Sequence, residues 1–245
     1  MIVYKILRMV LHLFVGLWTC AIVFPLTDAA GRDWRIKDWS EKLLAICGVH
    51  VDIQQAAGAQ PPARALIIAN HVSWLDVFVI NAWQPCRFVA KSDIRDWPLI
   101  GWLCARAGTI FIARGKRRDV RRIYEGLVAS LEVGERVAFF PEGTTAKQGE
   151  ILPFHANLFE AAIEAKVPLQ LHALRYLDAS GRFDPAVDFT DDTSFVKSMI
   201  RVLQAGEIRA ELRILPVIET AGEHRRELAV KARCAIISVL GYDPS

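Results

Sequence analysis

A histidine and an aspartate lie close together in the segment Asn70–Asp76, directly after the apolar run Ala65–Ala69. Such a run is typical of a buried strand, so the histidine stands where the strand ends. On one continuous helix, His71 and Asp76 would be about 140° apart around the axis and would not face each other. If His71 instead lies on the turn and Asp76 in the first turn of the helix, the carboxylate can reach back to the imidazole.

A carboxylate on one imidazole nitrogen fixes the tautomer and leaves the other nitrogen free to act as a base. Because the sequence has no Gly-x-Ser-x-Gly nucleophile motif, this pair is suited to direct activation of a substrate hydroxyl. General-base catalysis of this kind is worth about 10²–10⁴-fold in rate. Ser73 is available to cap the following helix. The alternative is that Ser73 and Asp76 are only caps and that His71 is an ordinary turn histidine.

A second polar cluster, Phe140–Thr145, reads Phe-Pro-Glu-Gly-Thr-Thr and follows the strand-like run Arg136–Phe140. Ligand sites in open α/β sheets gather at the carboxyl ends of strands. The two clusters are therefore expected to share one crevice. The alternative is that the second cluster is a plain Pro-Glu-Gly turn.

Basic side chains concentrate in residues 114–122, where six Lys or Arg and one acid, Asp119, give six minus one, or +5. Such a patch is suited to a phosphate or an anionic lipid headgroup, although a solvated helix start would look the same. Arg114 ends the run Gly108–Ala113 and is the residue best placed for the crevice. The basic residues are Arg114, Lys116, Arg117, Arg118, Arg121 and Arg122.

Alternating strands and helices must position these clusters. Apolar runs and alternation predict strands at 65–69, 87–90, 108–113, 136–140, 167–174 and 208–214. Helical periodicity predicts helices at 72–83, 116–131, 154–165, 193–203 and 222–240. This alternation predicts an α/β fold with a largely parallel central sheet flanked by helices.

An uncharged apolar stretch, Met9–Leu26, precedes the α/β segments. We interpret it as a retained membrane helix, the alternative being a cleaved signal peptide that ends near the small residues Ala29–Gly31. Eighteen residues rise only about 27 Å, so a span and a re-entrant hairpin both stay open. Basic residues are more numerous after the stretch than before it, which favours a catalytic body on the cytoplasmic side of the inner membrane.

The segment Asp33–Val49 carries an apolar stripe beside charged residues. This pattern fits an amphipathic helix lying in the membrane interface, or equally a surface helix packed on the core. Gln54–Pro62 is the best linker candidate. We therefore expect an N-terminal membrane-associated helical element at residues 1–53 and an α/β domain at residues 63–245.

The composition excludes several classes of protein. The chain has 245 residues, enough for one domain with an appendage, and its 53% apolar content excludes a disordered or collagen-like chain. Its 30 basic and 27 acidic residues give a net charge of only +3, so we expect no nucleic-acid partner. No histidine or cysteine pair has metal-ligand spacing, so we expect no metal.

These residues together resemble the glycerolipid acyltransferase family, most closely the bacterial 1-acyl-sn-glycerol-3-phosphate acyltransferases. The family motif Asn-His-x-Ser-x-x-Asp matches Asn70–Asp76, and the motif Phe-Pro-Glu-Gly-Thr matches Phe140–Thr144. Gly-x-x-Phe-Ile-x-Arg matches Gly108–Arg114, a Val-Ala-Lys stretch matches Lys91, and an apolar Val-Pro strand matches Val167-Pro168. The order and spacing agree from about residue 66 to residue 174.

The resemblance implies a glycerol-3-phosphate acyltransferase-like fold with an N-terminal membrane-embedded element. It implies transfer of a fatty acyl group from acyl-CoA or acyl carrier protein to the 2-hydroxyl of lysophosphatidic acid, giving phosphatidic acid. The membrane lipid and the acyl donor are the implied partners, and no cofactor is implied beyond the acyl donor substrate. His71 is implied to be the general base and Asp76 the group that orients it.

The same analogy assigns Arg114, Glu142, Gly143 and Thr144 to the acceptor-phosphate site. Because a carboxylate cannot bind phosphate favourably, we expect Glu142 to orient Arg114. Backbone N–H groups or Lys91 are expected to stabilise the thioester oxyanion.

Two of the family motifs show departures, and several functions remain as alternatives. Thr145-Ala146 stand where Arg-Ser is common, which affects the acceptor contacts, and Leu171 stands near the place of a second proline. The nearest alternative is the same chemistry on another lysolipid, such as lyso-ornithine lipid or a lysophospholipid. A non-enzymatic lipid carrier and a phosphatase that uses the basic patch are the others.

Overall fold

A central sheet of seven strands organises the computed structural model, which describes residues 2–57, 59–112, 117–190 and 193–243. In chain order the strands are β1 Val49–Gln55, β2 Leu66–Ala69, β3 Arg87–Lys91, β4 Ile110–Ile112, β5 Val137–Phe139, β6 Leu169–Leu177 and β7 Ile208–Ile214. Their spatial order is β1-β7-β6-β2-β5-β3-β4. Every neighbouring pair is parallel except β6 and β7, so the predicted, largely parallel α/β sheet is confirmed.

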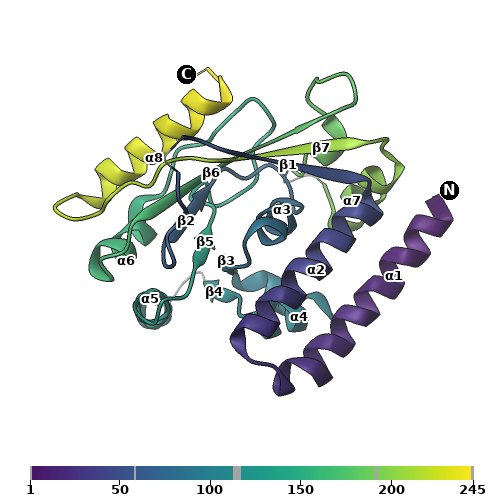
Figure 1. Cartoon of the computed structure of the whole chain (residues 1–245), viewed down its shortest axis with the longest axis horizontal. Helices are drawn as coiled ribbons and strands as arrows, with labels where there is room; N and C mark the ends of the chain where they lie inside the picture. Colours follow the sequence, from purple (N-terminus) through teal and green to yellow (C-terminus); the bar gives the residue numbers. More distant parts are fainter. Residues whose placement is uncertain (1, 58, 113–116, 191–192, 244–245) are drawn as a thin grey trace.

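Helices cover both faces of this sheet (Figure 1). They are α1 Ile2–Trp18, α2 Ala29–Cys47, α3 Asp76–Trp83, α4 Ile100–Arg106, α5 Arg117–Glu132, α6 Phe159–Glu164, α7 Phe195–Gln204 and α8 Arg225–Leu240. Side chains alternate across the short central strands, so that Ile67 joins a core with α2, α3 and α7. Leu66 and Ile68 join the opposite core with α5, α6 and α8. Strands buried on both faces account for the continuous apolar runs in the sequence.

The largest difference from the sequence-based prediction lies at the sheet edge. Residues 49–53 were expected to belong to the N-terminal helical element, but they form most of β1, which pairs in parallel with β7. Only Val49 of this strand is fully buried, and its last residues are exposed, so the apolar signal is weak. Helix α4 was also not predicted, and α3 begins at Asp76 rather than at Val72 because residues 72–75 form a turn.

The helices α1 and α2 lie side by side as a hairpin at one edge of the molecule (Figure 1). His12 and Trp39 lock the pair, because each ring nitrogen contacts the other residue's backbone carbonyl, at 2.9 Å and 3.1 Å, and the two rings stack. Gly16 makes this approach possible, since a Cβ there would lie 2.8 Å from Trp39 Nε1. Lys5 donates to the Leu203 carbonyl of α7 and fixes the start of α1 to the body.

The outward side of α1 stays apolar and exposed. Its exposed large apolar residues are Val3, Tyr4, Leu7, Val10, Leu11, Phe14, Val15 and Trp18. Among the described residues, Ile2–Leu26 is the one helical stretch that is long and apolar enough to cross a membrane. The apolar residues of α2 do not all face the same environment. Leu43 and Leu44 are buried in the core, whereas Trp34 is 62% exposed. The apolar outer surface of this hairpin supports membrane association.

His172 of β6 is fully buried, and neither ring nitrogen has a hydrogen-bond partner within the described part of the chain. Burial lowers the pKa of this imidazole from 6.5 to about 3. Below pH 6.5 the unfolded chain therefore binds a proton that the folded chain does not, so stability falls as the pH falls.

We expect the free energy of unfolding of the wild type to fall by about 2 kcal/mol between pH 7 and pH 5 relative to that of His172→Leu. Leucine leaves no polar group unpaired at this site. Urea unfolding of both proteins in the same detergent at the two pH values measures the difference. Parallel pH dependence of the two proteins would contradict the expectation.

Candidate active site

His71 and Asp76 form a hydrogen-bonded pair at the carboxyl end of β2. Asp76 is the first residue of α3, and its Oδ2 lies 2.8 Å from His71 Nδ1. The same oxygen accepts the backbone N–H groups of Val72 and Ser73, at 2.7 Å and 2.9 Å. The turn between the strand and the helix thus brings the carboxylate back to the imidazole, as the sequence predicted. Asp76 is fully buried, whereas 20% of the His71 side chain is exposed, so His71 is accessible to a substrate.

Ser73 does not cap the helix, contrary to the prediction. Its Oγ is buried and has no hydrogen-bond partner within the described residues, and no side chain caps α3. The acceptor for the free N–H groups of the turn is the Asp76 carboxylate, which therefore fixes the turn as well as the imidazole. Aspartate satisfies N–H groups at the start of a helix as readily as serine does.

The other oxygen of Asp76 is held by a residue that the sequence analysis missed. Tyr176 of β6 donates its hydroxyl to Asp76 Oδ1 at 2.6 Å, and the tyrosine is fully buried. Burial raises the pKa of Tyr176 well above its usual value, so the hydroxyl stays protonated and is a donor. A tyrosine in a buried apolar strand needs a partner for its O–H, and this was the one available signal.

Tyr176→Phe is expected to lower kcat about tenfold while the KM values for both substrates change little. The variant keeps the ring but leaves Asp76 Oδ1 without its donor, so the carboxylate is held less firmly against His71. Loss of a hydrogen bond to a buried charged group also costs about 1–3 kcal/mol of stability. Steady-state kinetics and thermal unfolding of the folded variant measure both effects. Wild-type kcat in a destabilised variant would limit Tyr176 to a structural role.

Glu142 joins the second polar cluster to the first. Its Oε1 accepts the backbone N–H of His71 at 2.7 Å, and its Oε2 accepts the backbone N–H of Leu152 at 2.7 Å. β5 is the neighbour of β2, so the two strand ends lie side by side, as the sequence predicted for the two clusters. Burial raises the pKa of Glu142 to about 7, against the effect of the two N–H groups.

Both oxygens of Glu142 accept hydrogen bonds from backbone N–H groups, and the expectation that Glu142 orients Arg114 stays a prediction. Arg114 itself lies outside the described residues, as does Lys116. Glu142 therefore acts within the described site as a brace between the His71 turn and the segment that follows β5. The sequence could not show this, because the partners of Glu142 are main-chain groups.

Further contacts fix the orientation of the imidazole ring and the position of the His71 backbone. The ring of Phe140 stacks on that of His71, with centroids 3.9 Å apart and an interplanar angle of 10°. The carbonyl of His71 accepts the N–H of Ala146 at 2.8 Å. Asn70 exchanges two hydrogen bonds with the backbone of Leu174 in β6, at 2.8 Å and 2.9 Å. His71 is thus held by groups on both neighbouring strands.

The other predicted site residues are spread along the same sheet edge. Gly143 follows Glu142 with φ +70°, and a Cβ there would lie 3.3 Å from the His155 ring, so glycine fits this turn. Thr144 comes next and is half-buried. Lys91 ends β3, which is separated from β2 by β5, so it lies about 10 Å along the sheet from the dyad strand.

This arrangement can remove a proton from a bound hydroxyl. Because Asp76 accepts a hydrogen bond from the His71 Nδ1 side, the favoured tautomer carries its proton there and leaves Nε2 as a lone-pair base. The buried carboxylate can then stabilise the imidazolium that forms.

Comparison with known proteins gives an independent view of the chain. Residues 50–174 match the protein family described as Acyltransferase. The chain is 33% identical over 213 residues to a 1-acyl-sn-glycerol-3-phosphate acyltransferase of Neisseria meningitidis serogroup B, covering 86% of this chain and 83% of the relative. It is 35% identical over 198 residues to a lyso-ornithine lipid O-acyltransferase of Pseudomonas aeruginosa, covering 81% and 75%.

The fold also has a counterpart among solved structures. The crystal structure of the 1-acyl-sn-glycerophosphate acyltransferase from Thermotoga maritima superposes with a TM-score of 0.69 at 17% identity. The match covers 98% of this chain and 95% of the other, so the likeness includes the N-terminal helices as well as the sheet.

Proposed function

Since this chain belongs to the Acyltransferase family and is an acyltransferase of the lysolipid kind, we propose that its acceptor is 1-acyl-sn-glycerol-3-phosphate and its product phosphatidic acid. The observation that carries the chemistry is the 2.8 Å contact between His71 Nδ1 and Asp76 Oδ2, made where the imidazole reaches the surface. A relative of that activity, 33% identical over most of both chains, supports the choice of acceptor.

In the proposed reaction, His71 Nε2 takes the proton from the 2-hydroxyl of the acceptor. The hydroxyl oxygen attacks the thioester carbonyl carbon, and the carbonyl π electrons move to its oxygen. The tetrahedral intermediate then collapses, breaks the carbon–sulfur bond and expels the thiolate, which receives the proton from the imidazolium. Asp76 stays ionised throughout and offsets the transient positive charge on His71.

The acyl donor in this proposal is acyl-CoA or acyl carrier protein. Backbone N–H groups near the crevice or Lys91 would stabilise the oxyanion. Arg114, Gly143 and Thr144 would receive the acceptor phosphate, with Glu142 bracing the loop that carries the last two. Gly143 and Thr144 follow β5 at the carboxyl edge of the sheet, and Arg114 follows β4 in the sequence, which is consistent with that assignment.

Lyso-ornithine lipid is the second candidate acceptor, because a relative of that activity is 35% identical to this chain. The dense basic charge of residues 114–122 favours a phosphate monoester, which carries close to two negative charges, over an amino-acid headgroup. We therefore place lysophosphatidic acid first.

We also propose that the protein resides in the inner membrane with its site on the cytoplasmic side, where acyl donors are made. The exposed apolar face of α1 would contact the lipid. The basic residues that follow the apolar stretch, Arg32, Arg35, Lys37 and Lys42, support the orientation. The hairpin of α1 and α2 would then hold the crevice next to its lipid acceptor.

The test is transfer of labelled palmitate by detergent-purified protein to lysophosphatidic acid, lyso-ornithine lipid or lysophosphatidylcholine. Palmitoyl-CoA and palmitoyl carrier protein serve as donors in parallel, and donor without acceptor measures simple hydrolysis. Labelled phosphatidic acid as the main product is the expected result. Product from lyso-ornithine lipid alone would overturn the acceptor but keep the chemistry, and no transfer from either donor would overturn both.

A further inference from the structure

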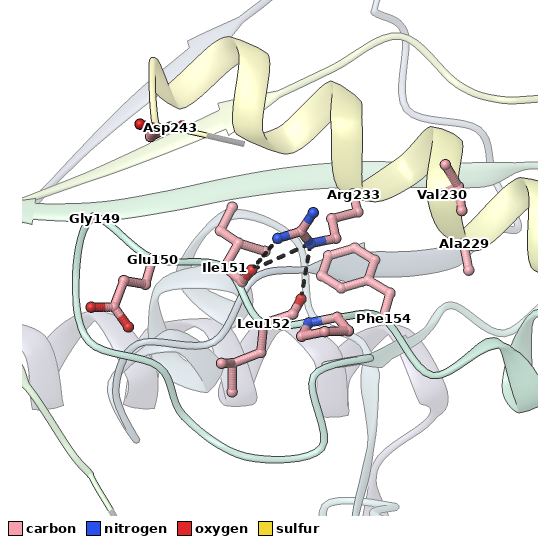
Figure 2. A pocket seen from close by; sticks show the side chains of 10 residues that line it. Gly149, Glu150, Ile151, Leu152, Phe154, Ala229, Val230, Arg233 and Asp243 are labelled. Atoms are coloured by element: carbon pink, nitrogen blue, oxygen red, sulfur yellow. Dashed lines mark hydrogen bonds between the residues drawn. The ribbon is translucent and has the colours of Figure 1, made fainter. Parts of the chain in front are cut away.

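Arg233 of α8 reaches across to the segment that follows β5 (Figure 2). Its Nη2 donates to the Ile151 carbonyl at 2.7 Å, and its Nε donates to the carbonyls of Ile151 and Leu152 at 3.3 Å and 3.2 Å. A guanidinium is a planar fork with fixed donor directions, so two neighbouring carbonyls held together are set in a defined orientation.

Leu152 links Arg233 to Glu142. Leu152 accepts through its carbonyl from Arg233 and donates through its N–H to Glu142 Oε2 at 2.7 Å. The other oxygen of Glu142 accepts the backbone N–H of His71. An unbroken series of polar contacts therefore runs from α8 through Leu152 and Glu142 to the turn that carries the imidazole.

The segment held by Arg233 borders a hollow on one side. Loop and helix together line an open hollow of about 700 Å³, with Gly149, Glu150, Pro153 and Phe154 on one side and Ala229 and Val230 on the other. Ile151 is buried in the core below, and Arg233 supplies the polar contacts above it (Figure 2). The guanidinium therefore supplies hydrogen bonds to this segment on the side that faces the hollow.

We propose that Arg233 is a positioning residue for acyl transfer. It holds the Leu152 N–H against Glu142, and Glu142 in turn fixes the position of the His71 backbone in the active site. The inference rests on the proposed function for its kinetic consequence, but its structural part stands independently. It assigns a role in the reaction to α8, which lies beyond residues 50–174 that match the family.

Two substitutions of Arg233 test the role, with a matched control on the same helix. Arg233→Met keeps the apolar stem and removes the donors, whereas Arg233→Lys keeps the charge but cannot present a rigid fork. Arg226→Met makes the same change at an exposed position of α8. We expect kcat to fall about 10–100-fold in Arg233→Met and about 3–10-fold in Arg233→Lys, with KM values within about threefold of wild type and no effect in the control.

Hydrogen–deuterium exchange of the same four proteins measures the structural part without any activity. The amides of His71 and Leu152 should exchange at least tenfold faster in Arg233→Met than in wild type or Arg226→Met, while the amides of α3 stay protected. Wild-type kcat and wild-type protection in a folded Arg233→Met would overturn the proposal. If Arg233→Met does not fold, unchanged kcat and protection in Arg233→Lys overturn it.

The exchange measurement also separates this proposal from the proposed function. If the wild type transfers no acyl group to any acceptor, the proposed function fails. Faster exchange in Arg233→Met that is confined to His71, Leu152 and their neighbours would still show that Arg233 positions the His71 turn. Unchanged exchange in Arg233→Met would overturn that positioning role.

Discussion

His71→Ala is expected to lower kcat for acyl transfer by about 10²–10⁴-fold, while the KM for the acyl donor changes little. The imidazole is the group that would take the hydroxyl proton, because its side chain is partly exposed and its Nδ1 is held by Asp76. Alanine leaves a gap beside Phe140, on which the imidazole stacks, but Asp76 keeps its other hydrogen-bond donors. Initial rates with labelled palmitoyl-CoA and the acceptor that proves active measure the effect.

A matched control is His50→Ala, which removes an exposed imidazole from β1. It should retain wild-type kcat, so a loss in both variants would indicate general damage to the protein. Near wild-type turnover in a folded His71→Ala would show that another group removes the proton. The assignment of His71 as the general base would then have to be abandoned, although the protein would still be an acyltransferase.

Asp76→Asn is expected to lower kcat by about 10²–10³-fold with the fold preserved. The amide oxygen can take the place of Oδ2 and still accept from Val72, Ser73 and His71. The amide nitrogen then faces Tyr176, whose hydroxyl can turn from donor to acceptor. What asparagine cannot supply is the negative charge that stabilises the imidazolium, so the loss appears in kcat.

Asparagine is more informative at this position than alanine. Asp76→Ala would leave the buried N–H groups of Val72 and Ser73 without an acceptor, at a cost of about 1–3 kcal/mol each. Loss of activity would then report unfolding as much as chemistry. Thermal unfolding of Asp76→Asn should stay within a few degrees of wild type while kcat falls. Equal kcat in wild type and Asp76→Asn would show that charge on this residue has no part in the reaction.

The sequence was sufficient to predict those parts of the site that lie on one chain segment. The apolar run before Asn70 located β2, and the spacing of His71 and Asp76 predicted that they meet only across a turn. The family resemblance added the expectation that Glu142 belongs to the same site. In each case the signal is local, since a strand end and a short turn fix the geometry.

Contacts made over long sequence distances could not be predicted in the same way. Tyr176 is 100 residues from Asp76 and meets it only because β6 pairs with β2. The backbone partners of Glu142 could not be predicted either, because no side-chain pattern reveals hydrogen bonds from the main-chain N–H groups of His71 and Leu152. The edge strand β1 was missed because its exposed half lacks the apolar run that marked the central strands.

The parallel pairing of β1 with β7 bears on how a detergent-free form of this protein can be engineered. Cutting the chain after residue 53, where composition suggests a boundary, would strip β1 from β7 and leave an open strand edge prone to aggregation. It would also remove Leu43 and Leu44 from the core. Water solubility is better sought by replacing outward-facing residues of α1, such as Leu7, Leu11 and Phe14, with charged ones, which leaves the sheet intact.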